Sequence, residues 1–333
     1  MTKILIISND KIFLTSKKIS SVYNDTINII EAINKDFNIY LISRISKFKN
    51  NFSSEIKNKI LRLNLKLLFS LKKKRLKIFM ISITPRNVLF YFIIKLFIKN
   101  IDGYVFLRSN GHKEYNKKIG KLGLVFYDIM QKYIEKHLKV ISVSKEITSS
   151  NIKFFLNPSE LKKIWFEKIK KVNLDIPKLL YFGRFRKEKG VYSLINLAKN
   201  FKFNYELTIA GDSSVNYPNN ENINFLNEFS EIKKIIKLYD THNIFILPSF
   251  TEGAPKVILE SLARKRPVIV FKEIKHVKLN FKGIFVCDRN TISLKKCINF
   301  IMKNYEKIQG NMKNNNLPTK KIFQKKLLNI LYE

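Results

Sequence analysis

Short apolar runs alternate along the chain with longer segments in which apolar residues recur every three or four positions. Runs of the first kind predict buried strands, and segments of the second kind predict amphipathic helices. The predicted strands cover residues 3–8, 38–43, 77–83, 104–107, 139–143, 178–182, 205–210, 223–226, 243–247, 268–271 and 283–287. The predicted helices cover residues 19–34, 54–71, 87–99, 115–137, 191–199, 231–239, 256–264, 293–305 and 319–331. This alternation predicts an α/β fold with doubly wound parallel sheets.

The pattern also divides the chain into parts. Its 333 residues are enough for two α/β domains. Helical periodicity fades between residues 150 and 173, and residues 173–177 have the composition of a linker. We therefore predict an N-terminal Rossmann-like domain over residues 1–172, a C-terminal one over residues 173–318, and a last helix within residues 319–333.

Residues 243–271 are the most informative stretch: an apolar run, a polar turn, a helical segment and a second apolar run. Two buried strands joined by a helix predict a parallel pair with a right-handed crossover. Ligands of such sheets bind beyond the carboxyl ends of the strands. The turn over residues 249–256 should therefore lie at the binding edge, with the amides of Gly253, Ala254 and Lys256 at a helix start. That arrangement is typical of a phosphate site.

Two glutamates accompany this turn. Glu252 lies within it, and Glu260 lies in the helix that follows. Carboxylates near helix-bound phosphates are suited to accept hydrogen bonds from sugar hydroxyls. A structural interpretation is also open, because Lys256, Glu260 and Arg264 are spaced four apart, as in a solvated stripe of ion pairs. The flanking strands and the Gly-Ala-Pro turn favour the ligand site.

A second turn of the same kind follows the strand over residues 178–182. Gly183 gives the backbone freedom, and Arg184 and Lys189 bring two cations before the next helix. Taken alone, the segment is a basic loop as often as a site. Because it also follows a parallel strand, it should open on the same edge as the first turn, and the two could grip one diphosphate. Gly211 ends a third strand at this edge.

These motifs resemble those of a known family. Glu252-Gly253-Ala254-Pro255 followed by Glu260 resembles the E-x7-E pattern of retaining glycosyltransferases of the GT-B fold, the family called family 4 or group 1. The segment from Gly183 to Gly190 is similar to that family's G-R-x4-K-G. The resemblance covers residues 178–271 and is thin over the first domain. Arg264-Lys265-Arg266 departs from it, and we expect this change to alter a helix C-cap rather than the site.

The resemblance implies a GT-B fold, with two Rossmann-like domains facing each other across a cleft and the last helix packed back on the first domain. It implies hexosyl transfer, with retention, from a nucleoside diphosphate sugar to a glycan or lipid-linked acceptor in surface polysaccharide or lipopolysaccharide assembly, without a metal or other cofactor. The implied catalytic residues are Glu252, Arg184 and Lys189. The implied donor-binding residues are Gly183, Arg184, Lys189, Gly211, Glu252, Gly253, Ala254, Lys256 and Glu260, with Glu252 on the sugar and Glu260 on the ribose.

The first domain offers a substrate loop of its own. Arg108, Asn110 and His112 follow the strand over residues 104–107, at the edge where substrates bind. By the resemblance, such a loop contacts the acceptor or the donor sugar. A turn built on Asn110-Gly111 with a solvated histidine explains the same residues equally well.

The charge is extreme, at +37 from 63 Lys and Arg against 26 Asp and Glu. It would attract nucleic acid, anionic lipid or nucleotide-linked substrates, or it reflects only a Lys-, Asn- and Ile-rich composition. Residues 54–71, followed by Lys72-Lys73-Lys74-Arg75, predict a basic amphipathic helix that either docks on an anionic membrane or is simply solvated. Cys287 and Cys297 lack metal-site spacing, so a cytoplasmic protein is expected, with docking on the inner membrane face as an option.

Three other functions are open. A nucleotide-sugar 2-epimerase on the same fold would need several carboxylates and histidines around the sugar, and the chain has only four His. A nucleic-acid binder would fit the charge, but no nucleic-acid motif is recognised, so we expect no nucleic-acid partner. A third alternative is an inactive relative that only scaffolds a pathway. The presence of Arg184 and Lys189 together with Glu252 and Glu260 argues against it.

Overall fold

The computed structural model describes residues 2–48, 52–64, 66–67, 69, 76–98, 100–144, 147, 151–211, 221–227, 231–278 and 281–333. Contacts within the chain divide it into two compact units. Residues 1–160 and 320–333 form unit 1, and residues 161–319 form unit 2. Residues 161–172, which the sequence placed in the first domain, therefore group with unit 2. Each unit has its own sheet.

The sheet of unit 1 is mainly parallel. Its strands are β1 (Thr2–Leu14), β2 (Lys18–Ser21), β3 (Phe37–Ile45), β4 (Phe52–Glu55), β5 (Ile60–Arg62), β6 (Leu76–Ile81), β7 (Ile101–Leu107), β8 (Lys139–Ser142) and β9 (Ile152–Phe155). Strands β5, β3, β1, β6, β7, β8 and β9 pair in parallel in that order. The fully buried run from Ile4 to Ile7 places β1 at the centre of the core, as expected for a parallel strand covered on both faces.

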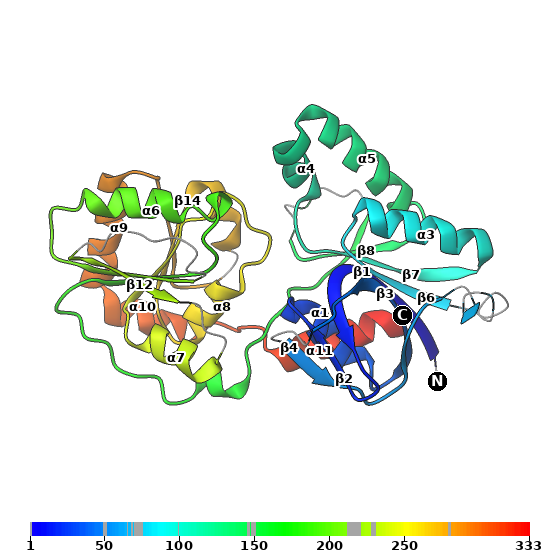
Figure 1. Cartoon of the computed structure of the whole chain (residues 1–333). Coiled ribbons are helices and arrows are strands. Elements are labelled where there is room, and N and C mark those ends of the chain that lie inside the picture. Colours follow the sequence, from blue (N-terminus) through cyan, green and yellow to red (C-terminus); the bar gives the residue numbers. More distant parts are fainter. Residues whose placement is uncertain are drawn as a thin grey trace. The chain divides into compact units, whose positions relative to one another are not determined.

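Helices cover both faces of this sheet. They are α1 (Asn24–Ile33), α3 (Pro85–Phe97), α4 (Gly111–Ile119), α5 (Lys121–Glu135) and α11 (Lys320–Tyr332). Figure 1 shows α3, α4 and α5 on one side and α1 and α11 on the other. The last helix is tied to this unit by an ion pair of 2.7 Å between Lys320 and Glu31 and by ring contact between Tyr332 and Phe37.

The N-terminal hairpin differs from the sequence prediction. The first strand was expected to stop at Asn9, yet β1 continues to Leu14, and its end pairs with β2 in antiparallel fashion. The predicted helix over residues 19–34 therefore begins only at Asn24. Residues such as Ile19 have helical spacing to the next apolar positions, but backbone pairing to β1 places them in a strand.

The predicted basic helix over residues 54–71 is wrong in its first half, where the chain forms β4 and β5. The Oδ1 atom of Asn34 holds the loop between these strands, accepting from the amides of Lys57 at 2.6 Å and Asn58 at 3.2 Å. Pairing with β2 and β3 satisfies the backbone and overrides the helical spacing of the leucines. The basic run Lys72-Lys73-Lys74-Arg75 lies outside the described residues.

The helix predicted over residues 115–137 is two helices. Gly120 separates α4 from α5 and has φ 67°, a conformation that favours glycine. Helix α4 also begins earlier than predicted, at Gly111, because the Asn110 side chain caps it by accepting from the amide of Lys113 at 3.1 Å.

Unit 2 has a fully parallel six-stranded sheet. In spatial order its strands are β12 (Ile223–Asn227), β11 (Glu206–Gly211), β10 (Lys178–Phe182), β13 (Ile244–Leu247), β14 (Val268–Phe271) and β15 (Ile284–Cys287). This order reverses between β10 and β13, as in dinucleotide-binding folds, and ligands of such sheets bind at that reversal. The sequence predicted all six strands.

The connections of unit 2 bury a single apolar core around this sheet. They are the short 3-10 helices η1 (Lys163–Phe166), η2 (Lys187–Lys189) and η3 (Lys272–Lys278) and the α-helices α6 (Val191–Lys199), α7 (Ile232–Asp240), α8 (Lys256–Ala263), α9 (Thr291–Lys303) and α10 (Tyr305–Met312). Figure 1 shows α6 and α7 on opposite faces. The chain is thus α/β in both units.

Candidate functional site

The basic turn that follows β10 and the acidic turn that follows β13 meet at the point where the strand order of the sheet reverses. The Lys189 ammonium lies 2.7 Å from a carboxylate oxygen of Glu252, and the amide of Phe250 donates to the carbonyl of Glu188 at 2.9 Å. Strands β10 and β13 are neighbours, so the turns at their carboxyl ends lie on one edge. The structure therefore brings together residues 63 positions apart in the sequence.

Glycines allow these turns to approach so closely. Gly190 has φ 68°, and a Cβ atom there would lie 1.9 Å from the carbonyl oxygen of Pro248. Gly211 lies against Gly183 in the same way, since a Cβ atom on Gly211 would lie 1.9 Å from the Gly183 carbonyl oxygen. Any larger residue at Gly190 or Gly211 would push the turns apart.

Arg184 supplies an exposed cation beside this junction. Its carbonyl accepts a hydrogen bond of 2.8 Å from the Tyr181 hydroxyl, which fixes the backbone of the turn. Its guanidinium makes no hydrogen bond or ion pair with any residue in the described ranges. Burial and the nearby Glu252 carboxylate raise the pKa of Tyr181, so this anchor remains a hydrogen-bond donor at neutral pH.

Glu252 is held from three directions. Its carboxylate accepts from the Ser249 hydroxyl at 2.6 Å as well as from Lys189, and its carbonyl lies 2.9 Å from the Nε2 atom of His276. Only 10% of its side chain is exposed. The carboxylate is therefore oriented, not free to turn in solvent.

The start of α8 lies next to Glu252. Pro255 precedes the helix with φ −72° and ψ 116°, and no side chain among the described residues caps the helix start. The amides around Gly253, Ala254 and Lys256 therefore bring the positive end of the α8 dipole to this edge of the sheet.

Glu260 occupies a different environment. One of its carboxylate oxygens accepts a hydrogen bond of 3.1 Å from the Tyr239 hydroxyl. Desolvation raises the pKa of the Glu260 carboxyl, although Tyr239 and the nearby Lys256 oppose this rise. Glu260 thus contacts Tyr239, and not Arg184 or Lys189. The solvated ion-pair stripe with Arg264 does not form, because Arg264 is buried elsewhere.

Arg289 is a site residue that sequence reasoning missed. Its guanidinium donates to the carbonyls of Pro248 at 2.8 Å and Ser249 at 3.2 Å, and it stacks 4.0 Å from the centre of the Phe250 ring. Arg289 thereby holds the backbone of the acidic turn in place. The sequence feature that could have identified Arg289 is its position shortly after β15, at the same carboxyl edge of the sheet as the other turns.

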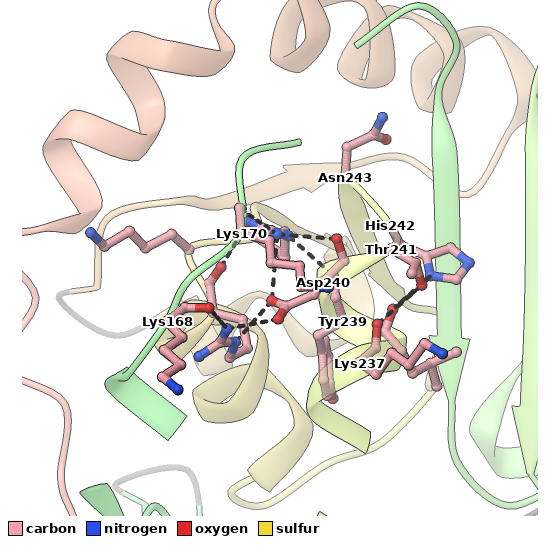
Figure 2. Close-up of polar contacts among 12 residues, drawn as sticks. Lys168, Lys170, Lys237, Tyr239, Asp240, Thr241, His242 and Asn243 are labelled. Atoms are coloured by element: carbon pink, nitrogen blue, oxygen red, sulfur yellow. Dashed lines mark hydrogen bonds and ion pairs between the residues drawn. The ribbon is translucent and has the colours of Figure 1, made fainter. Parts of the chain in front are cut away.

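Residues 264–266, which depart from the family motif, were predicted to alter only a helix C-cap. That prediction is wrong, because the two arginines form a buried cluster. Arg264 is completely buried and donates to both carboxylate oxygens of Asp240, at 2.9 and 2.7 Å. It also donates to three backbone carbonyls near the start of unit 2, those of Trp165, Glu167 and Lys168, at 2.7 to 3.1 Å. Figure 2 shows Asp240 at the centre of these contacts, with Lys168 and Lys170 beside it.

Arg266 completes the same cluster. It is also completely buried, and it donates to the carbonyls of Tyr239 at 3.1 Å and Lys170 at 3.0 Å. Lys265, between the two arginines, takes φ 55°, in the left-handed region. The cluster fastens residues 165–170 to the end of α7 and to the end of α8, the helix that carries Glu260.

The loop predicted in unit 1 is arranged differently from expectation. Arg108 lies at the sheet edge, where it pairs with Asp10 at 3.6 Å and donates to the Ser82 hydroxyl at 3.3 Å. Asn110 is a helix cap, and His112 lies in the first turn of α4, against the Tyr127 ring and 3.8 Å from Asp128. Asn110 therefore caps a helix instead of forming the expected turn, and His112 packs against Tyr127 instead of being solvated. Arg108 stays at the sheet edge.

Among the described residues, no three His, Cys, Asp or Glu side chains are grouped as a metal ion would require. Across the same part of the chain, no helix combines the length and the apolar character needed to cross a bilayer.

Comparison with known proteins shows which family unit 2 resembles. Residues 163–317 match the family described as glycosyl transferases group 1, a range that nearly coincides with unit 2. An uncharacterized glycosyltransferase of Haemophilus influenzae is 25% identical over 178 residues, covering 49% of this chain and 48% of that protein. A putative teichuronic acid biosynthesis glycosyltransferase of Bacillus subtilis, TuaC, is 22% identical over 183 residues, covering 54% and 46%. The matches thus span about half the length of these curated relatives.

Solved structures resemble the whole chain. The crystal structure of HepE from Anabaena in complex with UDP-glucose has a TM-score of 0.66 and 14% sequence identity, and the match covers 100% of each chain. At this identity the likeness shows the fold alone: two α/β domains with parallel sheets, the GT-B fold.

Proposed function

We propose that the protein transfers a sugar from a nucleoside diphosphate sugar to a glycan or lipid-linked acceptor, and the match of residues 163–317 to the group 1 glycosyl transferases supports this. The observation that carries the proposal is the meeting of Lys189 and Glu252 at the reversal point of a dinucleotide-binding type of sheet. Beside it lie a helix start and Arg184, whose guanidinium has no ion-pair partner among the described residues. These are the groups that a diphosphate linked to a sugar requires.

In this mechanism the cations act on the leaving group. Negative charge grows on the diphosphate as the bond to the sugar breaks, and Arg184, Lys189 and the amides at the start of α8 stabilise it. Charge stabilisation of this kind needs no metal or other cofactor. Arg184 is free to bind a phosphate as it stands, whereas Lys189 must first exchange the Glu252 carboxylate for the diphosphate.

The two glutamates take different parts in donor binding. Glu252, which Ser249 and Lys189 orient, would accept hydrogen bonds from hydroxyls of the donor sugar. Glu260 would accept from the ribose, replacing or sharing its contact with Tyr239. Carboxylate acceptors of this kind favour ligands that carry the matching hydroxyl over analogues that lack it, because the analogue leaves the carboxylate without a hydrogen-bond partner.

We propose hexosyl transfer with retention of configuration, and a product that belongs to a surface polysaccharide or lipopolysaccharide. The putative role of TuaC in teichuronic acid biosynthesis and the UDP-glucose complex of HepE support a UDP-type donor and a polysaccharide product. Arg108, at the edge of the unit 1 sheet, is proposed to contact the acceptor or the donor sugar. Cys287 and Cys297 are free thiols, which fits a reducing cytoplasm.

The test begins with donor binding and ends with turnover. Nucleoside diphosphates and their sugars are screened by thermal shift, and the stabilising donor is then used to measure release of the diphosphate. Replacing Lys189 by Ala should lower kcat by roughly a hundredfold or more, since the lysine acts as charge develops. Arg186→Ala is the matched control, because Arg186 lies in the same loop but is exposed and pairs only weakly with Glu188.

Two results would contradict the proposal. One is a complete absence of stabilisation by nucleotides and nucleotide sugars. The other is an equal effect of Lys189→Ala and Arg186→Ala on kcat. Retention is tested separately, by reading the anomeric configuration of the first product with NMR; an inverted product would remove that part of the proposal alone.

A further inference from the structure

Helix α5 turns an apolar stripe toward solvent. Its exposed large side chains are Leu122, Val125, Phe126 and Ile129, with exposures of 78%, 60%, 45% and 62%. Their spacing of three and four residues places all of them on one face of the helix. A helix of a globular protein normally buries such a stripe, so this face lacks the cover that its composition predicts.

Helix α3 has a stripe of the same kind. Leu89, Phe92 and Leu96 are 57%, 48% and 67% exposed, while Tyr91 and Ile94 on the opposite face are buried in the core of unit 1. The helix is therefore apolar on both faces, although only one face contacts the sheet.

The two stripes are continuous. Tyr133 of α5 lies with its ring 6.4 Å from that of Phe92 and 6.1 Å from that of Tyr91, so α3 and α5 pack along each other. Figure 1 shows α3, α4 and α5 together on one side of the unit 1 sheet. The exposed residues of α3 and α5 named above are called the outer apolar face. Contiguous apolar surface on this scale marks an interaction site.

Basic residues border the outer apolar face. Lys113, Lys117 and Lys118 are exposed on α4, and Lys121 opens α5. Helix α3 adds Lys95 and contains no acidic residue. The acidic Asp128 of α5 is neutralised by Lys132 at 2.7 Å. An apolar stripe with a cationic border is the pattern of helices that lie in a membrane interface.

We propose that the outer apolar face docks on an anionic lipid bilayer. The apolar side chains of α3 and α5 enter the boundary between headgroups and acyl chains, and the bordering lysines bind lipid phosphates. The net charge of +37 complements such a surface, because cytoplasmic leaflets carry negative charge. Docking here takes the place of docking through residues 54–71, and it does not depend on the proposed transferase activity.

A second copy of the chain is the less suitable occupant. Two copies of a chain with a charge of +37 repel each other, and the cationic border would bring lysine against lysine around the joined apolar faces. A bilayer supplies both complementary parts at once, an apolar interior and anionic headgroups.

The first experiment measures co-sedimentation of the full chain with vesicles of phosphatidylcholine mixed with phosphatidylglycerol. The triple variant Val125→Ser, Phe126→Ser, Ile129→Ser should weaken binding by roughly tenfold or more, because three inserted apolar side chains are lost. The matched control replaces Ile292 and Phe300 of α9 by Ser, since these are 69% and 54% exposed on a helix of unit 2. This control should bind like the unmodified chain.

A second pair of variants separates charge from apolar insertion. Lys117→Glu with Lys121→Glu should weaken binding to the anionic vesicles by roughly tenfold or more. Lys296→Glu with Lys303→Glu makes the same charge change on exposed positions of α9 and should have a smaller effect. Equal losses in the two pairs would overturn the proposal, because the attraction would then be a general one to a basic protein.

A fluorescent reporter decides whether this face contacts the lipid. The chain contains one Trp, and that residue, Trp165, is buried at 3% exposure. Emission of Val125→Trp should shift to shorter wavelength on anionic vesicles, while Ile292→Trp should not shift. An unshifted Val125→Trp in a vesicle-bound protein would overturn the proposal. So would concentration-dependent dimerisation abolished by the α5 triple variant, which would assign the face to a second copy.

Discussion

At the scale of single residues, the site is built on one charged contact. Lys189 and Glu252 neutralise each other across the junction of two turns, and Ser249 holds the carboxylate in place. By the proposed function, a sugar nucleotide separates this pair, since the lysine suits its phosphates and the carboxylate suits its hydroxyls. The ion pair thus holds both groups close to the positions in which the proposed donor would meet them.

Glu252→Gln should therefore have opposite effects on two ligands. Removal of the carboxylate frees Lys189 and removes repulsion of the phosphates, so the affinity for the nucleoside diphosphate should rise or stay level. The kcat with the sugar donor should fall by roughly tenfold to a hundredfold, because the hydrogen bonds of a charged acceptor to the sugar are lost. Calorimetric titration and initial rates measure the two effects, and parallel losses of both would refute this division of roles.

His242 makes a second prediction at this scale. Its Nδ1 atom lies 2.7 Å from the Leu238 carbonyl and its Nε2 atom 2.7 Å from the Thr208 hydroxyl, so a neutral ring satisfies both contacts. Burial lowers the pKa of His242 below its ordinary 6.5. The unfolded chain then binds more protons than the folded one as pH falls below about 6.5, so stability should decline there.

Urea melts at pH 7.5 and pH 5 provide the measurement. In the unmodified chain, the free energy of unfolding should be lower at pH 5, and His242→Gln should remove part of that loss. His137→Gln deletes a different imidazole and should keep the loss. An unchanged pH dependence in His242→Gln would show that other groups cause it.

At the scale of elements, the buried arginines join three segments that the sheet does not connect. Arg264, Arg266 and Asp240 link the ends of α7 and α8 with residues 165–170. Tyr239, next to Asp240, carries the hydroxyl that contacts Glu260. The cluster thus holds the two helices whose side chains form one end of the candidate donor site.

Asp240→Asn should lower the free energy of unfolding by about 3 kcal/mol, since it leaves two buried guanidinium groups without a countercharge. The expected measurement is a denaturant melt of the full chain. Glu231→Gln is the control, because it breaks an ion pair with Lys234 in which both side chains are more than half exposed, and it should cost less than about 1 kcal/mol. A similar small loss in both variants would show that the backbone carbonyls alone stabilise the arginines.

The same elements show what the sequence could predict. The inner strands of unit 2, β10, β11, β13 and β14, are short and mostly buried on both faces, so they stand out in the sequence as apolar runs. The parallel order of β10 and β13 then brings the turns at Arg184 and Glu252 together. Residues 54–62 show helical spacing, but their pairing partners lie in β2 and β3, which a local pattern does not contain. Arg264, Arg266 and Arg289 bind mostly backbone carbonyls, and such contacts depend on chain geometry, not on recognisable residue pairs.

At the scale of the whole molecule, unit 1 is assembled from two separate parts of the sequence. Helix α11 places Phe323, Leu327 and Leu331 in its core at 0–1% exposure, and Lys320 pairs with Glu31 of α1. Unit 2 lies between these parts in the sequence and has its own core.

Deletion of residues 320–333 should therefore damage one unit only. Loss of the three buried side chains should cost unit 1 roughly 5 kcal/mol or more. Amide hydrogen exchange should then speed up in β1 and β6 and stay slow in β10 and β13. Equal acceleration in both sheets would show that the two units do not unfold independently.

This arrangement also orders events during synthesis on the ribosome. Residues 320–333 emerge only after all of unit 2 has been made, so unit 2 can fold while unit 1 still lacks a helix. Throughout that interval the surface of α1 that α11 will cover is exposed to water and to other nascent chains. We expect chaperones to bind the growing chain at that surface, and a stalled chain that ends before residue 320 to aggregate through it.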